Sequence, residues 1–306
     1  MGRNNRVLKT LLFVTVCCYF AYALYWFVKT IPWMVEISLR PEYYSPPTGL
    51  RFTNSYSVSI AYFDEYSSFF GLLVRVVGAS YALLAAFLIL KTETNSFPVI
   101  RDKISKALLL EGLYFLSLIP AIYFLLGFSA LPSVSNFLIS TNLLTQILLI
   151  SPFFISLGIK VRKYDSGAGR SSLLRLAGLS SMNYMIALWV SYMLKWTEMS
   201  AADPYLFSAF APRIFGFLNT IVVQSLAVVF AVVGLLHILR KSGADNTMRW
   251  WGLSLIFLST HIILYVIYVA SVGIPRFIPF GELWVIPLLG LGIYLLLKNP
   301  RVKLVP

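Results

Sequence analysis

Two charged side chains that lie inside long apolar runs are the residues most able to do chemistry in this sequence. Glu111 falls within the run 107–127 and Arg75 within the run 69–90. A charged group near the centre of a bilayer costs about 2.5–3.5 kcal/mol on insertion scales, so each of them is a candidate site. Glu111 is either a proton or cation site in a pathway, or a structural acid paired with a cytoplasmic Lys or Arg. Arg75 either binds an anion in a central cavity, or snorkels outward and pairs with an external acid.

The expected depths place these two side chains near different ends of their helices. At a rise of 1.5 Å per residue, Glu111 lies about 6 Å below the cytoplasmic edge of its run and Arg75 about 9 Å inside the outer end of its own. The sequence therefore predicts separate partners for them.

Uncharged polar side chains add four residues to this candidate polar pathway. Asn142 and Gln146 are four residues apart and so share one face of a helix. Gln224 falls in the sixth apolar run and His261 near the middle of the seventh. Such residues either line a polar cavity or hold helices together by hydrogen bonds, and the sequence leaves both readings open.

No residue pattern points to a metal, a cofactor or a catalytic centre. The two histidines, His237 and His261, differ in depth by roughly 12 Å along the bilayer normal, too far to share one metal or haem. Cys17 and Cys18 are adjacent inside the first apolar run, so they cannot build a structural zinc site. We therefore expect no metal, no cofactor and no catalytic residue. A lipid-modifying enzyme would have only Glu111 and the histidines as acid or base.

The elements that must position these side chains are membrane-spanning helices. Hydrophobic residues make up 58% of the 306 residues and charged residues 12%, which lies outside the soluble range. Runs of the length that crosses a hydrocarbon core recur from end to end. The sequence predicts a single all-α polytopic membrane domain over 1–306 with eight transmembrane helices: Leu8–Val28, Phe69–Leu90, Ala107–Gly127, Leu138–Ile159, Leu173–Leu194, Phe215–Leu239, Trp251–Val272 and Leu283–Leu297.

The distribution of Lys and Arg assigns a side of the membrane to each connection. If the first connection is external, eighteen of the 25 basic residues fall on the side that holds both termini. Cytoplasmic connections carry this excess, so we expect both termini in the cytoplasm and the protein in the cell membrane. The net charge of +13 sits in short clusters between apolar runs. We therefore expect anionic lipid at the cytoplasmic face as a partner, and no nucleic acid.

The connection 30–68 is the longest and is rich in tyrosine. We expect it outside the membrane, as an interfacial anchor or as a lid. Apolar and small polar residues alternate over 55–62, which predicts a short strand there. Similar motifs open the second and sixth runs, at Phe70-Gly71 and at Phe215-Gly216. They suggest a pseudo-repeat of two four-helix halves, 1–160 and 173–306.

Two functions of different classes fit this sequence. The first is a transporter or channel for an ion, a small solute or a lipid, indicated by polar residues in several runs and by the helix-breaking Pro120, Pro152 and Pro287. The second is a noncatalytic subunit or scaffold that works with partner subunits in a larger membrane complex. A cavity reaching the midplane favours the first, whereas a dry core with paired amides favours the second.

Overall fold

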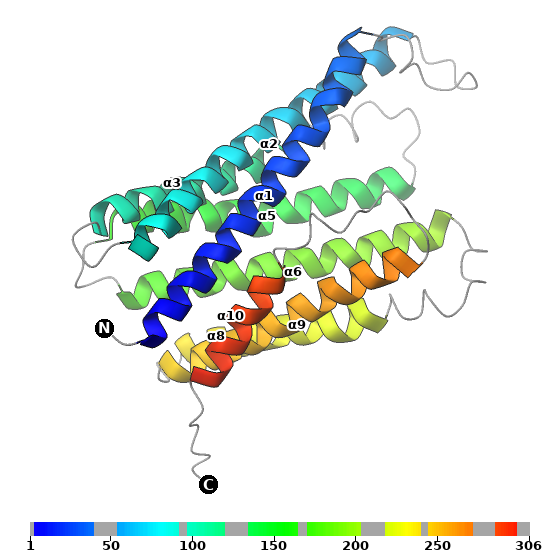
Figure 1. Ribbon diagram of the computed structural model, residues 1–306. Helices are drawn as coiled ribbons and strands as arrows, with labels where there is room; N and C mark the ends of the chain where they lie inside the picture. Colours follow the sequence, from blue (N-terminus) through cyan, green and yellow to red (C-terminus); the bar gives the residue numbers. More distant parts are fainter. Residues whose placement is uncertain are drawn as a thin grey trace.

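A computed structural model describes eight stretches of the chain: 3–39, 54–91, 97–119, 134–164, 170–202, 218–239, 244–271 and 285–298. In these stretches every regular element is a helix (Figure 1). The all-α class predicted from the sequence is therefore confirmed over this part of the chain.

Each of the eight described helices overlaps one of the eight apolar runs. They are α1 (Arg3–Leu39), α2 (Asn54–Lys91), α3 (Phe97–Leu116), α5 (Val134–Arg162), α6 (Arg170–Ala202), α8 (Ser225–Leu239), α9 (Ala244–Ser271) and α10 (Val285–Lys298). A π-helical segment, η3 (Asn219–Gln224), runs directly into α8 and forms one rod with it.

The helices pack as a closed ring in the order of the chain. Each helix makes its main contacts with the next one along the sequence, and the last, α10, returns to α1. In Figure 1, α1 crosses the front of the molecule with α2 and α3 above it and with α9 and α10 below. Successive helices run in opposite directions, so the start of α1 and the end of α10 lie at the same end of the ring.

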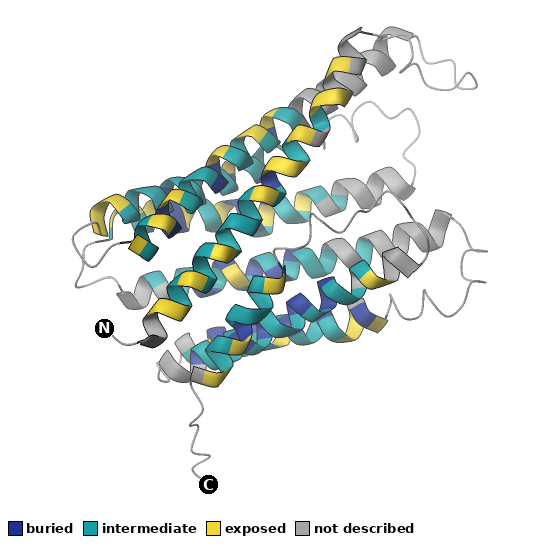
Figure 2. Ribbon diagram, in the orientation of Figure 1, coloured by how far each residue is buried: buried dark blue, intermediate teal, exposed yellow. Residues whose placement is uncertain are grey.

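The outer surface of the ring is apolar. Along α1, exposed residues recur every seven positions, a spacing that keeps one helix face outward, and they form the exposed bands in Figure 2: Val7, Val14, Ala21, Val28 and Val35. Exposed residues of α2 likewise share one face: Phe70, Leu73, Val77, Leu84 and Phe87. A surface of large aliphatic and aromatic side chains suits a hydrocarbon solvent.

Three of the described helices are long and apolar enough to cross a membrane. The qualifying segments are Arg6–Pro32, Phe69–Lys91 and Leu143–Arg162, of 27, 23 and 20 residues. Ile221–His237 and Val285–Leu297 are apolar but shorter. The composition of these helices is compatible with a membrane protein.

The prediction of a short strand over 55–62 is wrong. These residues belong to α2, which begins at Asn54, while α1 continues to Leu39. Extending a helix that already exists adds one hydrogen bond for each residue fixed, whereas a strand needs a partner edge. Residues 40–53 lie outside the described stretches, and the external position of this connection stays a prediction.

The third predicted run has its boundaries shifted. Instead of spanning 107–127, the helix α3 begins ten residues earlier at Phe97 and ends at Leu116. Pro120 explains the end, because a proline has no N–H to donate to the carbonyl four residues before it, which is that of Leu116. The next turn is tightened, and the Leu118 N–H donates to the Phe115 carbonyl at 3.3 Å. Residues 120–133 lie outside the described stretches.

Glycines bring the backbones of α9 and α10 into close contact. A Cβ added at Gly292 would lie 2.9 Å from the Gly252 carbonyl oxygen, and a Cβ at Gly252 would lie 2.9 Å from the Gly292 oxygen. Helices in membranes use small residues in this way to approach closely.

Replacing Gly292 with leucine should therefore separate α9 from α10. We expect a loss of about 1–3 kcal/mol of unfolding free energy, the usual cost of overpacking, measured by detergent-induced unfolding in micelles. Gly290→Ala is the matched control on the same helix, because a Cβ there meets only Leu11 Cδ2 at an ordinary 3.5 Å. Equal stability of Gly292→Leu and this control would contradict the close crossing.

Basic residues gather at the end of the ring that holds both termini. The described ones lie within nine residues of a helix end on that side: Arg6, Lys9, Lys91, Arg101, Lys103, Lys106, Lys160, Arg162, Lys163, Arg175 and Arg249. The Nζ atoms of Lys103 and Lys106 lie 5.2 and 5.6 Å, respectively, from the centre of the Tyr81 ring. Lys106 also pairs with Asp102 at 2.8 Å, and this hydrogen bond lowers the pKa of the Asp102 carboxyl.

Candidate functional site

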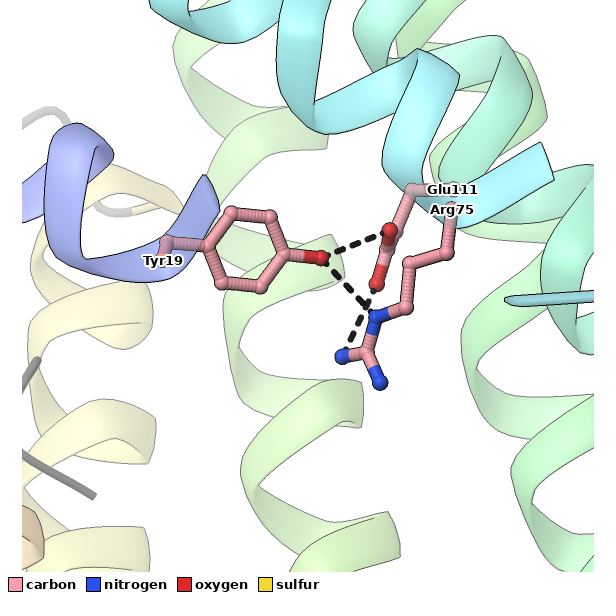
Figure 3. Close-up of polar contacts among 3 residues, drawn as sticks. All are labelled: Tyr19, Arg75 and Glu111. Carbon is pink, nitrogen blue, oxygen red and sulfur yellow. Dashed lines mark hydrogen bonds and ion pairs between the residues drawn. The ribbon is translucent and has the colours of Figure 1, made fainter. Parts of the chain in front are cut away.

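Three polar side chains from α1, α2 and α3 meet inside the ring (Figure 3). The Tyr19 hydroxyl donates to Glu111 Oε2 at 2.8 Å, and Arg75 Nε donates to the Tyr19 oxygen at 3.1 Å. Arg75 Nη2 lies 3.4 Å from Glu111 Oε1, which closes the triangle with an ion pair. We call Tyr19, Arg75 and Glu111 the polar triad.

Aromatic rings surround the guanidinium of the polar triad. Its central carbon lies 4.7 Å from the centre of the Tyr114 ring, 5.5 Å from that of Tyr19 and 5.8 Å from that of Tyr22. Rings at these distances stabilise a cation through their π faces. The charge of Arg75 is thus held by side chains of α1 and α3.

The polar triad faces the interior of the ring. At 100° per residue, Arg75 lies on the same side of α2 as the buried Gly71, Gly78 and Ala79, opposite the exposed face of that helix. Tyr19 likewise lies opposite the exposed heptad positions of α1. The side chains of Arg75 and Glu111 each keep 14% of their surface exposed. Both charged side chains are thus mostly buried.

The polar triad lies near the middle of the helices that hold it. Tyr19 is at the centre of the apolar segment Arg6–Pro32, roughly 20 Å from either end. Arg75 is sixteen residues before the end of α2 at Lys91, or roughly 24 Å, and Tyr19 is the same distance from the start of α1 at Arg3.

The structure corrects the expected partners of both charged residues. Among the described residues, Glu111 and Arg75 pair with each other, and neither pairs with the cytoplasmic base or the external acid expected from the sequence. The expected difference in their depths is wrong because α3 starts ten residues earlier than predicted. Glu111 therefore lies fourteen residues into its helix, level with Arg75 on α2.

A second group of buried polar side chains lies between η3 and α9. Asn219 Nδ2 donates to the His261 carbonyl at 3.0 Å, and the side chains of Gln224, Ser259 and His261 are fully buried nearby along these helices. Gln224 is fifteen residues from the end of α8 and His261 seventeen residues from the start of α9, roughly 22 and 25 Å. This second group thus lies at about the level of the polar triad.

The π-helical segment makes this second group unusual. Asn219 and Gln224 are its first and last residues. Single π turns inside longer helices are rare and are frequent at functional sites. Within the described part of the chain, neither the Oε1 nor the Nε2 of Gln224 has a hydrogen-bond partner. A buried amide without a partner costs about 1–3 kcal/mol, so its presence calls for a role beyond packing.

The remaining two candidates, Asn142 and Gln146, lie on α5. Gln146 is partly buried on this helix. Asn142 is one turn earlier on the same helix, and its side chain lies outside the described part of the structure. The six predicted residues thus divide into Arg75 with Glu111, Gln224 with His261, and the α5 pair.

Several other polar side chains only hold helices together. Ser151 donates to the Gly112 carbonyl and Ser105 to the Gly158 carbonyl, both at 2.8 Å, between α3 and α5. Ser254 of α9 donates to the Ala227 carbonyl of α8, also at 2.8 Å. Among the described residues, no three His, Cys, Asp or Glu side chains lie together in a way that could hold a metal ion.

Comparison with known proteins found no protein-family model, no curated protein and no solved structure that matches this chain.

Sequence reasoning missed Tyr19 as a site residue. The chain has 18 tyrosines, and most tyrosines in a membrane protein anchor it at the interface. The available signal was depth, because Tyr19 lies near the centre of the first apolar run, where a hydroxyl needs a partner. Its position was compatible with hydrogen bonding to a charged residue of a neighbouring helix.

Proposed function

We propose that this chain is a multi-pass transport protein of the cell membrane that moves an ion, a small solute or a lipid through the interior of its helix ring. The observation that carries this proposal is the polar triad, which holds a mostly buried ion pair near the middle of long apolar helices. Buried charges in membrane proteins most often mark substrate or ion pathways.

The proposed topology is eight spans with both termini in the cytoplasm. Its support is the one-sided gathering of basic residues at the end of the ring where the chain begins and ends. Anionic lipid headgroups at that face are the proposed partners of these basic residues. The origin by duplication of 1–160 and 173–306 stays a prediction.

The second candidate function is a noncatalytic subunit or scaffold of a larger membrane complex. One observation favours it: both carboxylate oxygens of Glu111 already have protein partners, Tyr19 and Arg75. A pair satisfied in this way can serve packing alone, as the serine bonds between α3 and α5 do.

Flux into proteoliposomes separates the two functions. Gradients of sodium, potassium, chloride, phosphate and a small carboxylate are imposed in turn, and a fluorescent lipid reports lipid exchange. We expect one of these fluxes to exceed that of protein-free liposomes. Glu111→Gln should lower this flux about tenfold or more, because losing the charge should raise the rate-limiting barrier by at least about 1.4 kcal/mol.

The control for this assay is Gly290→Ala, which lies outside both polar groups and should transport as the parent protein does. Flux in Glu111→Gln equal to that of the parent protein would remove Glu111 from the pathway. If every flux equals that of protein-free liposomes, the transport proposal fails and the scaffold reading stands.

A further inference from the structure

Within the described part of the chain, one edge of the Arg75 guanidinium has no hydrogen-bond partner. Its Nε donates to Tyr19, its Nη2 faces Glu111, and the Tyr114 ring covers one of its faces at 4.7 Å. Among the described residues, no acceptor lies within hydrogen-bonding distance of Nη1. An arginine side chain carries five N–H donors in a fixed fork, so donors remain available. In Figure 3 this terminal nitrogen points away from both Tyr19 and Glu111.

Both carboxylate oxygens of the polar triad, by contrast, already have one protein partner. Glu111 Oε2 accepts the Tyr19 hydroxyl, and Oε1 lies 3.4 Å from Arg75 Nη2. A cation would have to approach beside the guanidinium, whose positive charge repels it, whereas an anion would find free N–H donors. The site is therefore complementary to an acceptor group with negative charge, and a planar fork suits a carboxylate or a phosphate.

Net charge decides how an anion can bind here. Arg75 and Glu111 together are neutral, and adding an anion alone would leave one uncompensated negative charge at half depth, which is costly. Taking up one proton on Glu111 together with one monovalent anion keeps the site neutral. The other titratable groups facing the pair are tyrosines: Tyr19 and Tyr22 from α1, Tyr114 from α3 and Tyr184 from α6.

We propose that the free edge of Arg75 binds the oxyanion group, carboxylate or phosphate, of the transported substrate, and that Glu111 takes up one proton as the anion binds. This inference rests on the proposed transport function and gives it a substrate class, a monovalent anion that moves with a proton. The protonated Glu111 keeps its contact with Tyr19, while Arg75 exchanges Glu111 for the anion. The overall positive charge of the chain, +13, also attracts anions.

Binding of an oxyanion to the protein in phosphatidylcholine nanodiscs tests this inference without any flux measurement. The probe is methanesulfonate, which is ionised at every pH used, and its apparent affinity is read from the rise in unfolding temperature. For the parent protein we expect affinity to rise as the pH falls from 8 to 5, by up to about tenfold per pH unit, because one proton is bound with each anion.

Three variants sharpen the test. Glu111→Gln resembles the protonated state and should bind methanesulfonate at least about tenfold more tightly than the parent protein at pH 8, with no dependence on pH. The double variant Arg75→Gln/Glu111→Gln should not bind it. Asp102→Asn is the matched control, since it removes one carboxylate at the basic end without touching the polar triad, and it should behave as the parent protein does.

The inference is overturned if the double variant binds as tightly as Glu111→Gln, or if neither the parent protein at pH 5 nor Glu111→Gln binds the probe.

Nanodiscs containing phosphatidylglycerol identify the source of the anion. If the site takes a lipid phosphate, the anionic lipid fills it, and added methanesulfonate no longer raises the unfolding temperature in these nanodiscs. If the site takes a soluble anion, methanesulfonate raises the unfolding temperature as it does in phosphatidylcholine. Binding of methanesulfonate without any flux in the liposome assay would support this anion site and contradict the transport function. Flux without binding would support transport and contradict the anion site.

Discussion

Replacing Arg75 with methionine while Glu111 remains should lower the unfolding free energy by about 3–5 kcal/mol, the usual cost of leaving one partner of a buried ion pair uncompensated. Glu111 would lose the cation at 3.4 Å and keep only the hydrogen bond from Tyr19. Unfolding of the micelle-embedded protein by denaturing detergent, followed by tryptophan fluorescence, measures this loss.

The double variant Arg75→Met/Glu111→Met separates a lost pair from a lost side chain. Removing both charges leaves nothing uncompensated, so stability should return to within about 1 kcal/mol of the parent protein, or exceed it. A single variant that costs less than about 1 kcal/mol at pH 8 would show that Glu111 is solvated without Arg75. A double variant as unstable as the single one would assign the loss to packing of the arginine stem.

The helices themselves were predictable because their apolar runs leave few alternatives. Leu8–Val28 and Phe69–Leu90 are recovered inside α1 and α2, and the other six runs each overlap a described helix. A backbone in an apolar medium must satisfy its own hydrogen bonds, so a long apolar run forms a helix. The predicted strand over 55–62 failed because a period of two over so few residues cannot outweigh extension of an adjoining helix.

The polar triad was only half predictable. Arg75 and Glu111 stood out as charges in apolar runs, but their pairing depends on where α3 begins and on which helices become neighbours. The sequence does not show which face of each helix is turned toward its neighbours, because apolar residues surround the charged residue on every side of the helix. The π-helical segment at Asn219–Gln224 was likewise invisible, because shifting a hydrogen bond by one residue changes no residue type.

If the proposed function is right, two neighbouring residues of α1 should behave differently, because one faces the interior of the ring and the other its apolar exterior. Tyr22 lies 5.8 Å from the Arg75 guanidinium, inside the ring, whereas Ala21 belongs to the exposed apolar face at nearly the same depth. In a membrane that exposed face meets lipid. A thiol reacts as its thiolate, which forms poorly in apolar surroundings and more readily beside a guanidinium.

Thiol labelling at these two positions tests this claim most directly. Cys17 and Cys18 are first replaced with alanine, then Tyr22→Cys and Ala21→Cys are made separately, and each protein in liposomes is treated with a small charged thiosulfonate reagent. We predict that Tyr22→Cys reacts at least about tenfold faster than Ala21→Cys. Faster or equal labelling of Ala21→Cys would contradict burial of this face in lipid, and no labelling of Tyr22→Cys would contradict an accessible interior.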